Sequence, residues 1–271
     1  KNNTIKISNW LKKNKIKKND RIAAYLPNYI ETVEAYLAST SIGAIWSSCS
    51  PDFGSNGVIE RFSQIKPKVL FIGDKYFYNG KKINILNRAE EIIKKISSIK
   101  FLIIVNYPGE KFQNQNLKIK GVKILNIKKI LNNPITKFNF KLFKFDHPLT
   151  IVYSSGTTGK PKCICHRTGG ILLQHIKDLS LHSDVKTGDN VFYFTTCGWM
   201  MWNWLVSSLA LRASIVLFDG FPMHKKKDLL IELVDKEEIT LFGVSAKYID
   251  TLKKNKVSTK KKFKLKKLKT I

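Results

Sequence analysis

Acidic residues and cysteines are scarce in this sequence. Its 271 residues include 20 Asp and Glu against 48 Lys and Arg, and only four cysteines. These cysteines form no Cys-x-x-Cys pair, and a chain that is 43% hydrophobic can bury a core without disulfides. A disulfide-stabilised secreted protein is therefore not predicted, and a reducing cytoplasm is the expected location. The cysteines are Cys49, Cys163, Cys165 and Cys197.

A cluster of metal ligands is also lacking. Cys163 and Cys165 lie two residues apart in an extended run and share one face, whereas His166 points to the other. No metal site is predicted because this segment offers too few ligands. We interpret these two cysteines as structural thiols, and His166 and His175 as helix-entry and packing residues.

No apolar run is long and clean enough to predict a membrane span. The most apolar window, residues 199–218, is interrupted by five polar residues, and no membrane partner is predicted. These residues are Asn203, Ser207, Ser208, Arg212 and Ser214. The chain opens on Lys1, which leaves an upstream targeting segment open. The oligomeric state is not predicted.

The shortage of acidic residues leaves a formal net charge of +28. Such a charge is typical of proteins that bind polyanions such as nucleic acid. The excess is nearly all lysine, however, and is spread along the whole chain together with abundant Asn and Ile. We favour a compositional bias over a nucleic-acid partner. The charge would still attract anionic small molecules.

Short apolar runs alternate with helical patterns along the chain. The runs are continuous rather than alternating, as expected for strands that are covered on both faces. They are residues 21–26, 44–49, 69–73, 101–107, 149–155, 191–196, 214–220 and 240–245. Helices are predicted at residues 30–43, 56–65, 86–97, 169–181 and 225–237. This order predicts an α/β fold with a mostly parallel sheet.

The first of these helices has start and stop signals. Asn28 and Glu31 resemble a capping box, and Gly43 is expected to end the helix. Residues 108–146 are predicted to be an irregular excursion. The lysine-rich residues 253–271 are predicted to be a solvated helix and strand edge.

Residues 153–162, YSSGTTGKPK, contain almost no apolar surface and many hydrogen-bond donors. Glycines let a loop turn its backbone N–H groups toward one point, as phosphate-binding loops do. A Walker A loop has four residues between its first glycine and its Gly-Lys pair, whereas two separate Gly156 from Gly159. The following residues, KCICH, predict a strand. We therefore expect a phosphate-binding loop between two strands.

The decamer resembles the signature of the adenylate-forming enzymes, which include acyl-CoA synthetases, luciferases and peptide-synthetase adenylation domains. The segments IWSSCSPDFG and TTCGWMMWN are similar to the acetoacetate-activating branch of that superfamily. The resemblance runs from about residue 17 to the end. It implies two stacked, mostly parallel sheets flanked by helices, with one subdomain at residues 1–165 and a second, incomplete one at 166–271.

The resemblance also implies roles for individual residues and ligands. The expected substrates are acetoacetate, ATP with Mg²⁺, and coenzyme A. The phosphate loop would consist of Ser154, Ser155, Gly156, Thr157, Thr158, Gly159 and Lys160. The acyl pocket and thiol approach would be lined by Trp199, Met200, Met201, Trp202 and Asn203. The pantetheine arm of CoA would meet Ser50, Pro51 and Asp52.

The chain departs from the family pattern after the loop. Cys163 and Cys165 replace small or aliphatic residues, and Arg167 with Thr168 replaces Ser-His. Both changes roughly preserve size, so phosphate binding is still expected. The resemblance places the adenine-contacting segment, the ribose-binding aspartate and the C-terminal domain with the adenylation lysine beyond Ile271. This segment alone is therefore expected to be a poor or inactive catalyst.

The aromatic and methionine residues at 199–202 also fit ordinary core. Three alternatives to the expected function stay open on the sequence, of which acetyl- or propionyl-CoA synthetase is the near one. A basic nucleic-acid-binding protein is the distant one. The third is an inactive product that keeps only the fold.

Overall fold

The computed structural model describes residues 1–109, 117–154, 159–259 and 262–271. Its chain divides into two units, each with its own sheet. The first unit comprises residues 1–76 and 82–170, and the second comprises residues 77–81 and 171–271.

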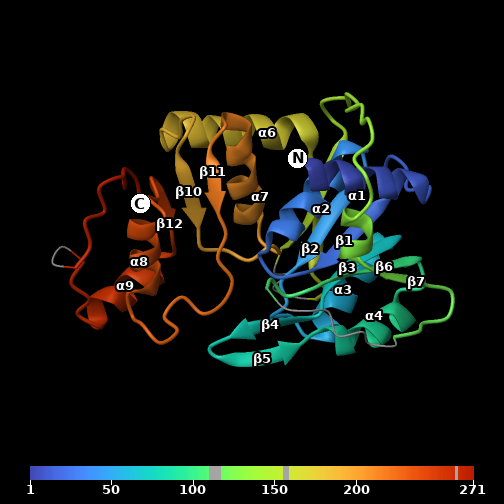
Figure 1. The fold of residues 1–271 in the computed structure, drawn as a ribbon, viewed down its shortest axis with the longest axis horizontal. Helices are drawn as coiled ribbons and strands as arrows, with labels where there is room; N and C mark the ends of the chain where they lie inside the picture. The colour runs from blue at the N-terminus through green and yellow to red at the C-terminus, as the bar shows by residue number, and fades with distance from the viewer. Residues whose placement is uncertain (110–116, 155–158, 260–261) are drawn as a thin grey trace. The chain divides into compact units, whose positions relative to one another are not determined.

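The first unit is built on a seven-stranded sheet with the order β7-β6-β3-β1-β2-β8-β9 (Figure 1). Neighbouring strands are parallel except for β8 and β9, which are antiparallel. The strands are β1 (Arg21–Tyr25), β2 (Ile45–Cys49), β3 (Val69–Gly73), β6 (Phe101–Val105), β7 (Lys123–Asn126), β8 (Pro148–Ser154) and β9 (Lys162–Arg167). All residues of β2 and β3 are buried, as continuous apolar runs predict.

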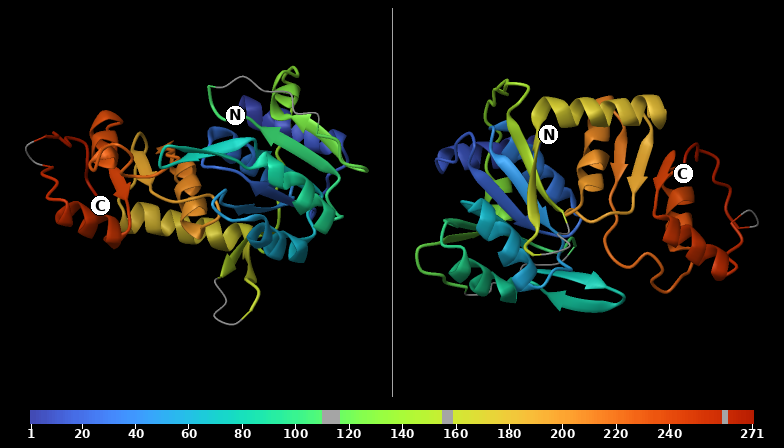
Figure 2. Two further views of the ribbon diagram at one scale, coloured as in Figure 1. Left: turned by 90° about the horizontal axis from the view of Figure 1, so that it is seen from below. Right: turned by 180° about the vertical axis from the view of Figure 1, so that it is seen from behind.

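Helices cover both faces of this sheet. One group packs as α1 against α2 and α5, and another as α3 against α4 (Figures 1 and 2). The connections β1-α2-β2 and β2-α3-β3 run in opposite directions across the sheet, so right-handed crossovers place α2 and α3 on opposite faces. The helices are α1 (Asn2–Lys13), α2 (Ile30–Ser41), α3 (Ser55–Ile65), α4 (Ala89–Lys95) and α5 (Ile127–Leu131).

The second unit contains a three-stranded parallel sheet with the order β11-β10-β12. The strands are β10 (Asn190–Tyr193), β11 (Ser214–Val216) and β12 (Leu241–Gly243). Phe192 and Phe242 lie at the centre of its core, with ring centroids 5.6 Å apart. The helices are α6 (Thr168–Lys177), which begins in the last residues of the first unit, α7 (Met200–Ser207), α8 (Leu229–Lys236) and α9 (Ala246–Lys254).

Shorter elements complete the chain. β4 (Lys75–Tyr78) pairs with β5 (Lys81–Asn84), and the tip of this hairpin, residues 77–81, is grouped with the second unit. A 3₁₀ turn at Leu86–Arg88 precedes α4, a π-helical turn at Asp178–His182 follows α6, and a 3₁₀ turn at Ser208–Leu211 follows α7. No helix in the described ranges is long and apolar enough to cross a membrane. The predicted α/β fold with mostly parallel sheets flanked by helices is confirmed.

The start signal predicted for α2 is wrong, whereas its stop signal is confirmed. Tyr29 is the N-cap residue and makes no side-chain cap hydrogen bond, while Asn28 is buried. The hydroxyl of Thr32 instead donates to the Pro27 carbonyl, 2.7 Å away. Gly43 follows the helix with φ +77°, and an added Cβ would lie 2.5 Å from Phe143. Only glycine fits this helix end without strain.

Three segments are more ordered than the sequence predicts. The unpredicted helix α1 buries Ile7 and Leu11. The predicted irregular excursion 108–146 contains β7 and α5. The predicted solvated stretch 253–271 packs Phe263, Leu265 and Leu268 against the second core, and Thr270 forms a bridge with Leu241. In each case sparse apolar residues are buried by tertiary contacts that the lysine-rich pattern does not indicate.

Candidate functional site

The predicted phosphate loop connects β8 to β9, and both flanking strands are confirmed. Ser154 at the end of β8 pairs with Lys162 at the start of β9. Ser155, Gly156, Thr157 and Thr158 lie outside the described residues, so their role as phosphate donors stays a prediction.

The end of the loop is described and has an unusual backbone. Gly159 has φ +120°, and nothing lies within 4 Å of a Cβ built on it. A side chain would fit the space there, but the backbone angle is one that L-residues rarely adopt. Lys160 is exposed, and no ion pair to its amine exists among the residues the structure describes. Its positive charge is thus available to an anion.

Helix α3 holds the loop in place after Lys160. The Gln64 side-chain amide donates to the carbonyl of Pro161, 2.9 Å away, and to that of Glu60, also 2.9 Å away. The thiol of Cys163 lies 3.6 Å from the side-chain amide oxygen Oε1 of Gln64. Gln64 therefore fixes the point at which the chain leaves the loop.

Arg61, which sequence reasoning missed, brings a second positive charge to this region. Its guanidinium lies 4.3 Å from the centre of the Phe53 ring and 5.8 Å from that of Tyr153. Tyr153 directly precedes Ser154, so this charge lies close to the start of the loop. Stacking of a guanidinium on aromatic rings is favourable and keeps its charge oriented. Nothing in the helical pattern of 56–65 distinguishes Arg61 from a surface residue.

The Tyr153 hydroxyl forms hydrogen bonds with strand β2 and helix α3. It lies 3.0 Å from the Ser47 hydroxyl and 3.3 Å from the Arg61 carbonyl. Burial raises the pKa of Tyr153, while the hydrogen bond from Ser47 acts in the opposite direction. The phenol therefore stays neutral and supports the base of the loop.

The predicted CoA-contacting residues form a tight turn after β2. The N–H of Phe53 donates to the Ser50 carbonyl, 3.2 Å away, and the Ser50 hydroxyl donates to the Asp52 carboxylate, 2.8 Å away. Ser50 is buried and Asp52 is exposed. Strand β2 lies parallel to β8 in the sheet, so Ser50, Pro51 and Asp52 share the carboxyl edge of the sheet with Ser154. Ligands of parallel sheets bind at this edge.

The buried Tyr25 and the half-buried Arg88 support the backbone of this turn. The Tyr25 hydroxyl donates to the Phe53 carbonyl, 2.5 Å away, and lies 3.2 Å from the Pro51 carbonyl. Arg88 donates to the Tyr25 hydroxyl and to the Phe53 carbonyl, the latter 2.9 Å away. Burial raises the pKa of Tyr25 to about 12, although the nearby Arg88 charge lowers it. A neutral phenol and a guanidinium thus orient the backbone of the turn.

The five predicted acyl-pocket residues lie in the second unit and have different environments. Trp199, the N-cap residue of α7, is 64% exposed, and Met200 is 40% exposed. Met201 is half-buried, whereas Trp202 and Asn203 lie in the interior. Trp199 and Met200 are therefore the members of this group that present large apolar surfaces to solvent.

Asn203 and His175 are polar residues that are buried inside the second unit. The buried Asn203 side-chain oxygen has no hydrogen-bond partner among the described residues, although such acceptors are normally satisfied. His175 is buried, and its Nδ1 lies 2.9 Å from the Ser207 hydroxyl, which donates to the Asn203 carbonyl. The predicted packing role of His175 is confirmed. His166, by contrast, lies within β9 rather than at a helix entry.

None of the four cysteines forms a disulfide, and they fall into two classes. Cys49 and Cys197 are buried, whereas Cys163 and Cys165 are exposed on the edge strand β9. The interpretation of Cys163 and Cys165 as structural thiols is therefore wrong, because the side chains of β9 are largely exposed on both faces of the strand. Within the described part of the chain, no three His, Cys, Asp or Glu side chains are placed to hold a metal ion.

Comparisons of the sequence with known proteins identify the family to which the chain belongs. The model of the family described as AMP-binding enzyme matches residues 3–271. The chain is 42% identical over 263 residues to acetoacetyl-CoA synthetase from Gallus gallus, covering 96% of this chain and 39% of that protein. It is 44% identical over 235 residues to acetoacetyl-coenzyme A synthetase from Rhizobium meliloti (strain 1021), covering 87% and 36%.

A solved structure gives the same result for the fold. Acetoacetyl-CoA synthetase from Streptomyces lividans superposes with a TM-score of 0.91 at 35% identity, covering 98% of this chain and 40% of that one. The resemblance inferred from the sequence motifs is confirmed. The chain spans less than half the length of the relatives it matches.

Proposed function

The chain belongs to the AMP-binding enzyme family, and on that basis we propose that it is part of an AMP-forming acid–thiol ligase that converts acetoacetate to acetoacetyl-CoA. The substrates are acetoacetate, Mg-ATP and coenzyme A, and the product would enter lipid metabolism. One observation carries the proposal: the loop that follows β8 and the turn that follows β2 share the carboxyl edge of a parallel sheet.

In the first half-reaction, a carboxylate oxygen of acetoacetate attacks the α-phosphorus of ATP. A new oxygen–phosphorus bond forms, the bond to the β-phosphate oxygen breaks, and pyrophosphate leaves with the electron pair. Backbone N–H groups between Ser154 and Lys160 would bind the departing phosphates, and Lys160 and Arg61 would supply positive charge. Stabilisation of developing charge is commonly the largest catalytic contribution.

In the second half-reaction, the CoA thiol attacks the acyl carbon of the mixed anhydride and AMP leaves. The turn formed by Ser50, Pro51 and Asp52 would contact the pantetheine arm. The acyl pocket would be lined by Trp199, Met200, Met201, Trp202 and Asn203. Bulky side chains there would favour a short acid, since a hydrophobic pocket discriminates by roughly 1–3 kcal/mol per methylene.

Mg²⁺ would enter bound to the phosphates of ATP, as is usual for this ion, and no residue of this chain is assigned to it. None of the four cysteines forms a disulfide, which supports a reducing compartment, and we propose that the protein is cytoplasmic.

The experiment is acid-dependent exchange of labelled pyrophosphate into ATP by the full protein, with acetoacetate, acetate and propionate compared. We expect acetoacetate to give the highest kcat/KM. A higher kcat/KM for acetate or propionate would show that this acid, and not acetoacetate, is the substrate. Absence of exchange with every acid would refute the proposal. Tight, steeply salt-dependent binding to duplex DNA would instead support the nucleic-acid alternative raised by the net charge.

A further inference from the structure

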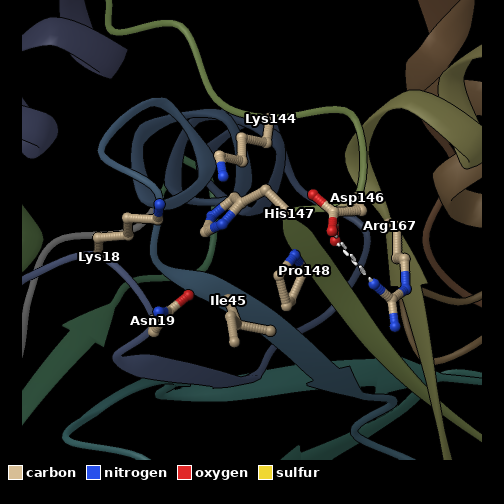
Figure 3. A pocket seen from close by; sticks show the side chains of 8 residues that line it. All are labelled: Lys18, Asn19, Ile45, Lys144, Asp146, His147, Pro148 and Arg167. Atoms are coloured by element: carbon tan, nitrogen blue, oxygen red, sulfur yellow. Dashed lines mark hydrogen bonds and ion pairs between the residues drawn. The ribbon is translucent and has the colours of Figure 1, made fainter.

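A hollow of about 370 Å³ opens in the first unit at the edge of the sheet opposite the loop (Figure 3). Its walls come from the turn before β1, the start of β2, the approach to β8 and the end of β9. Arg167 pairs with Pro148 at this end of the β8–β9 hairpin, whereas Ser154 pairs with Lys162 at the other. The seven residues of β8 separate the two ends by about 20 Å, so the hollow is not part of the candidate catalytic site.

Positive charge gathers around this hollow. Lys18, Lys144 and Arg167 line it together with a single carboxylate, that of Asp146. The Arg167 guanidinium lies 3.8 Å from the Asp146 carboxylate, and both side chains are more than half exposed, so this pair is weak. Within the described ranges, neither Lys18 nor Lys144 forms an ion pair. Of the three cationic side chains in the lining, the two lysines therefore carry charge that no carboxylate of the described residues pairs with.

The backbone between the two lysines is tied together by packing and hydrogen bonds. His147 is buried, its Nε2 lies 3.1 Å from the Gly43 carbonyl, and its ring stacks on Phe143 at 4.8 Å. The N–H of Asn19 donates to the same Gly43 carbonyl, 2.8 Å away. These contacts join the segment that carries Lys18 to the segment that carries Lys144. The backbone that carries the two lysines is thus held in place, which lowers the cost of ordering this part of the site on binding.

The floor of the hollow is apolar. Ile45 is buried, and Pro148 lies beside it at the start of β8 (Figure 3). A volume of about 370 Å³ exceeds what a bare phosphate ion needs and falls in the range of small-molecule sites. A ligand that suits both features has a doubly charged end and a compact apolar body.

We propose that this hollow is a second anion site that binds a small phosphate monoester. The phosphate dianion contacts Lys18, Lys144 and Arg167, and the organic group rests on Ile45 and Pro148. Phosphate suits this lining better than a carboxylate because it carries about two charges and offers three strongly accepting oxygens. The Asp146 carboxylate limits the affinity by repulsion.

The test is isothermal titration of the full chain with phenyl phosphate and with inorganic phosphate. We expect saturable binding of phenyl phosphate that is tighter than that of inorganic phosphate. Replacing both lysines (Lys18→Ala with Lys144→Ala) should weaken phenyl phosphate binding about tenfold, since each removes a charge-assisted hydrogen bond at a partly exposed site. The matched control replaces two exposed lysines elsewhere in the first unit, Lys95→Ala with Lys129→Ala, and should bind like the wild type.

A second variant tests the same site in the opposite direction. Asp146→Asn should tighten phenyl phosphate binding several-fold, because it removes the repelling charge. Circular dichroism confirms the fold of each variant, and acetoacetate-dependent pyrophosphate exchange should be unchanged by the lysine replacements. Absence of saturable binding to the wild type, or equal weakening in the control variant, would overturn the site. Equal or tighter binding of inorganic phosphate would overturn the assignment to a monoester.

Discussion

The most informative substitution is Tyr25→Phe, which removes one buried hydroxyl and leaves the ring in place. That hydroxyl donates to the Phe53 carbonyl at 2.5 Å and accepts from Arg88, and it lies beneath the turn that we assign to CoA. The Tyr25 side chain is fully buried, so water cannot replace the lost partner. The substitution therefore tests whether the turn depends on its support.

The expected loss of stability follows from the contacts that remain. Arg88 keeps its 2.9 Å hydrogen bond to the Phe53 carbonyl, so neither group is left wholly without a partner. The free energy of unfolding should then fall by about 2 kcal/mol, which is the sum for one neutral hydrogen bond and one partly compensated charged hydrogen bond. We also expect the KM for CoA to rise while acetoacetate-dependent pyrophosphate exchange stays close to that of the wild type.

The matched control is Tyr248→Phe in the second unit. The Tyr248 hydroxyl is buried and has no hydrogen-bond partner among the described residues, so its removal should be neutral or slightly stabilising. Urea unfolding followed by circular dichroism compares the two variants, and steady-state kinetics gives the KM. Equal stability of both variants would refute the supporting role of Tyr25. An unchanged KM for CoA would refute the assignment of the turn.

Three further predictions concern other parts of the chain. Gly159→Ala should lower the free energy of unfolding by about 1–3 kcal/mol, because alanine is strained at φ +120°, and it should slow pyrophosphate exchange. The control is Gly170→Ala, at an unstrained position. Equal exchange rates of the two variants would contradict the role of the loop. Trp199→Gly should admit longer acids, measured as the chain-length profile of exchange, and an unaltered profile would exclude Trp199 from the pocket. Burial alone would raise the pKa of Asp189, but hydrogen bonds from Lys269 and the Lys186 N–H outweigh it and lower the pKa. The stabilising effect of the Asp189 carboxylate is present above its unfolded-state pKa and is lost as the pH falls through the lower folded-state pKa. Asp189→Asn should therefore make the free energy of unfolding less dependent on pH on the acid side. Identical acid-unfolding profiles of the variant and the wild type would contradict this.

The amino-acid sequence by itself determined the class of fold and the position of the loop between β8 and β9 for which we predict phosphate binding. Continuous apolar runs such as 69–73 predict buried parallel strands because burial on both faces leaves no polar position in the pattern. The loop was recognisable because its glycines and hydroxyls are contiguous in sequence. These signals are local, and each is contained within about ten residues.

Only the tertiary structure decided which residues meet. Tyr25 and Arg88 support the same turn although 63 residues separate them, and Lys18 and Arg167 line one hollow from opposite ends of the first unit's sequence. A side-chain pattern reports whether a position is buried, but the order of strands in the sheet decides which positions become neighbours. Strand order depends on the packing of the whole unit, and for that reason Arg61 and the basic hollow left no mark in the sequence.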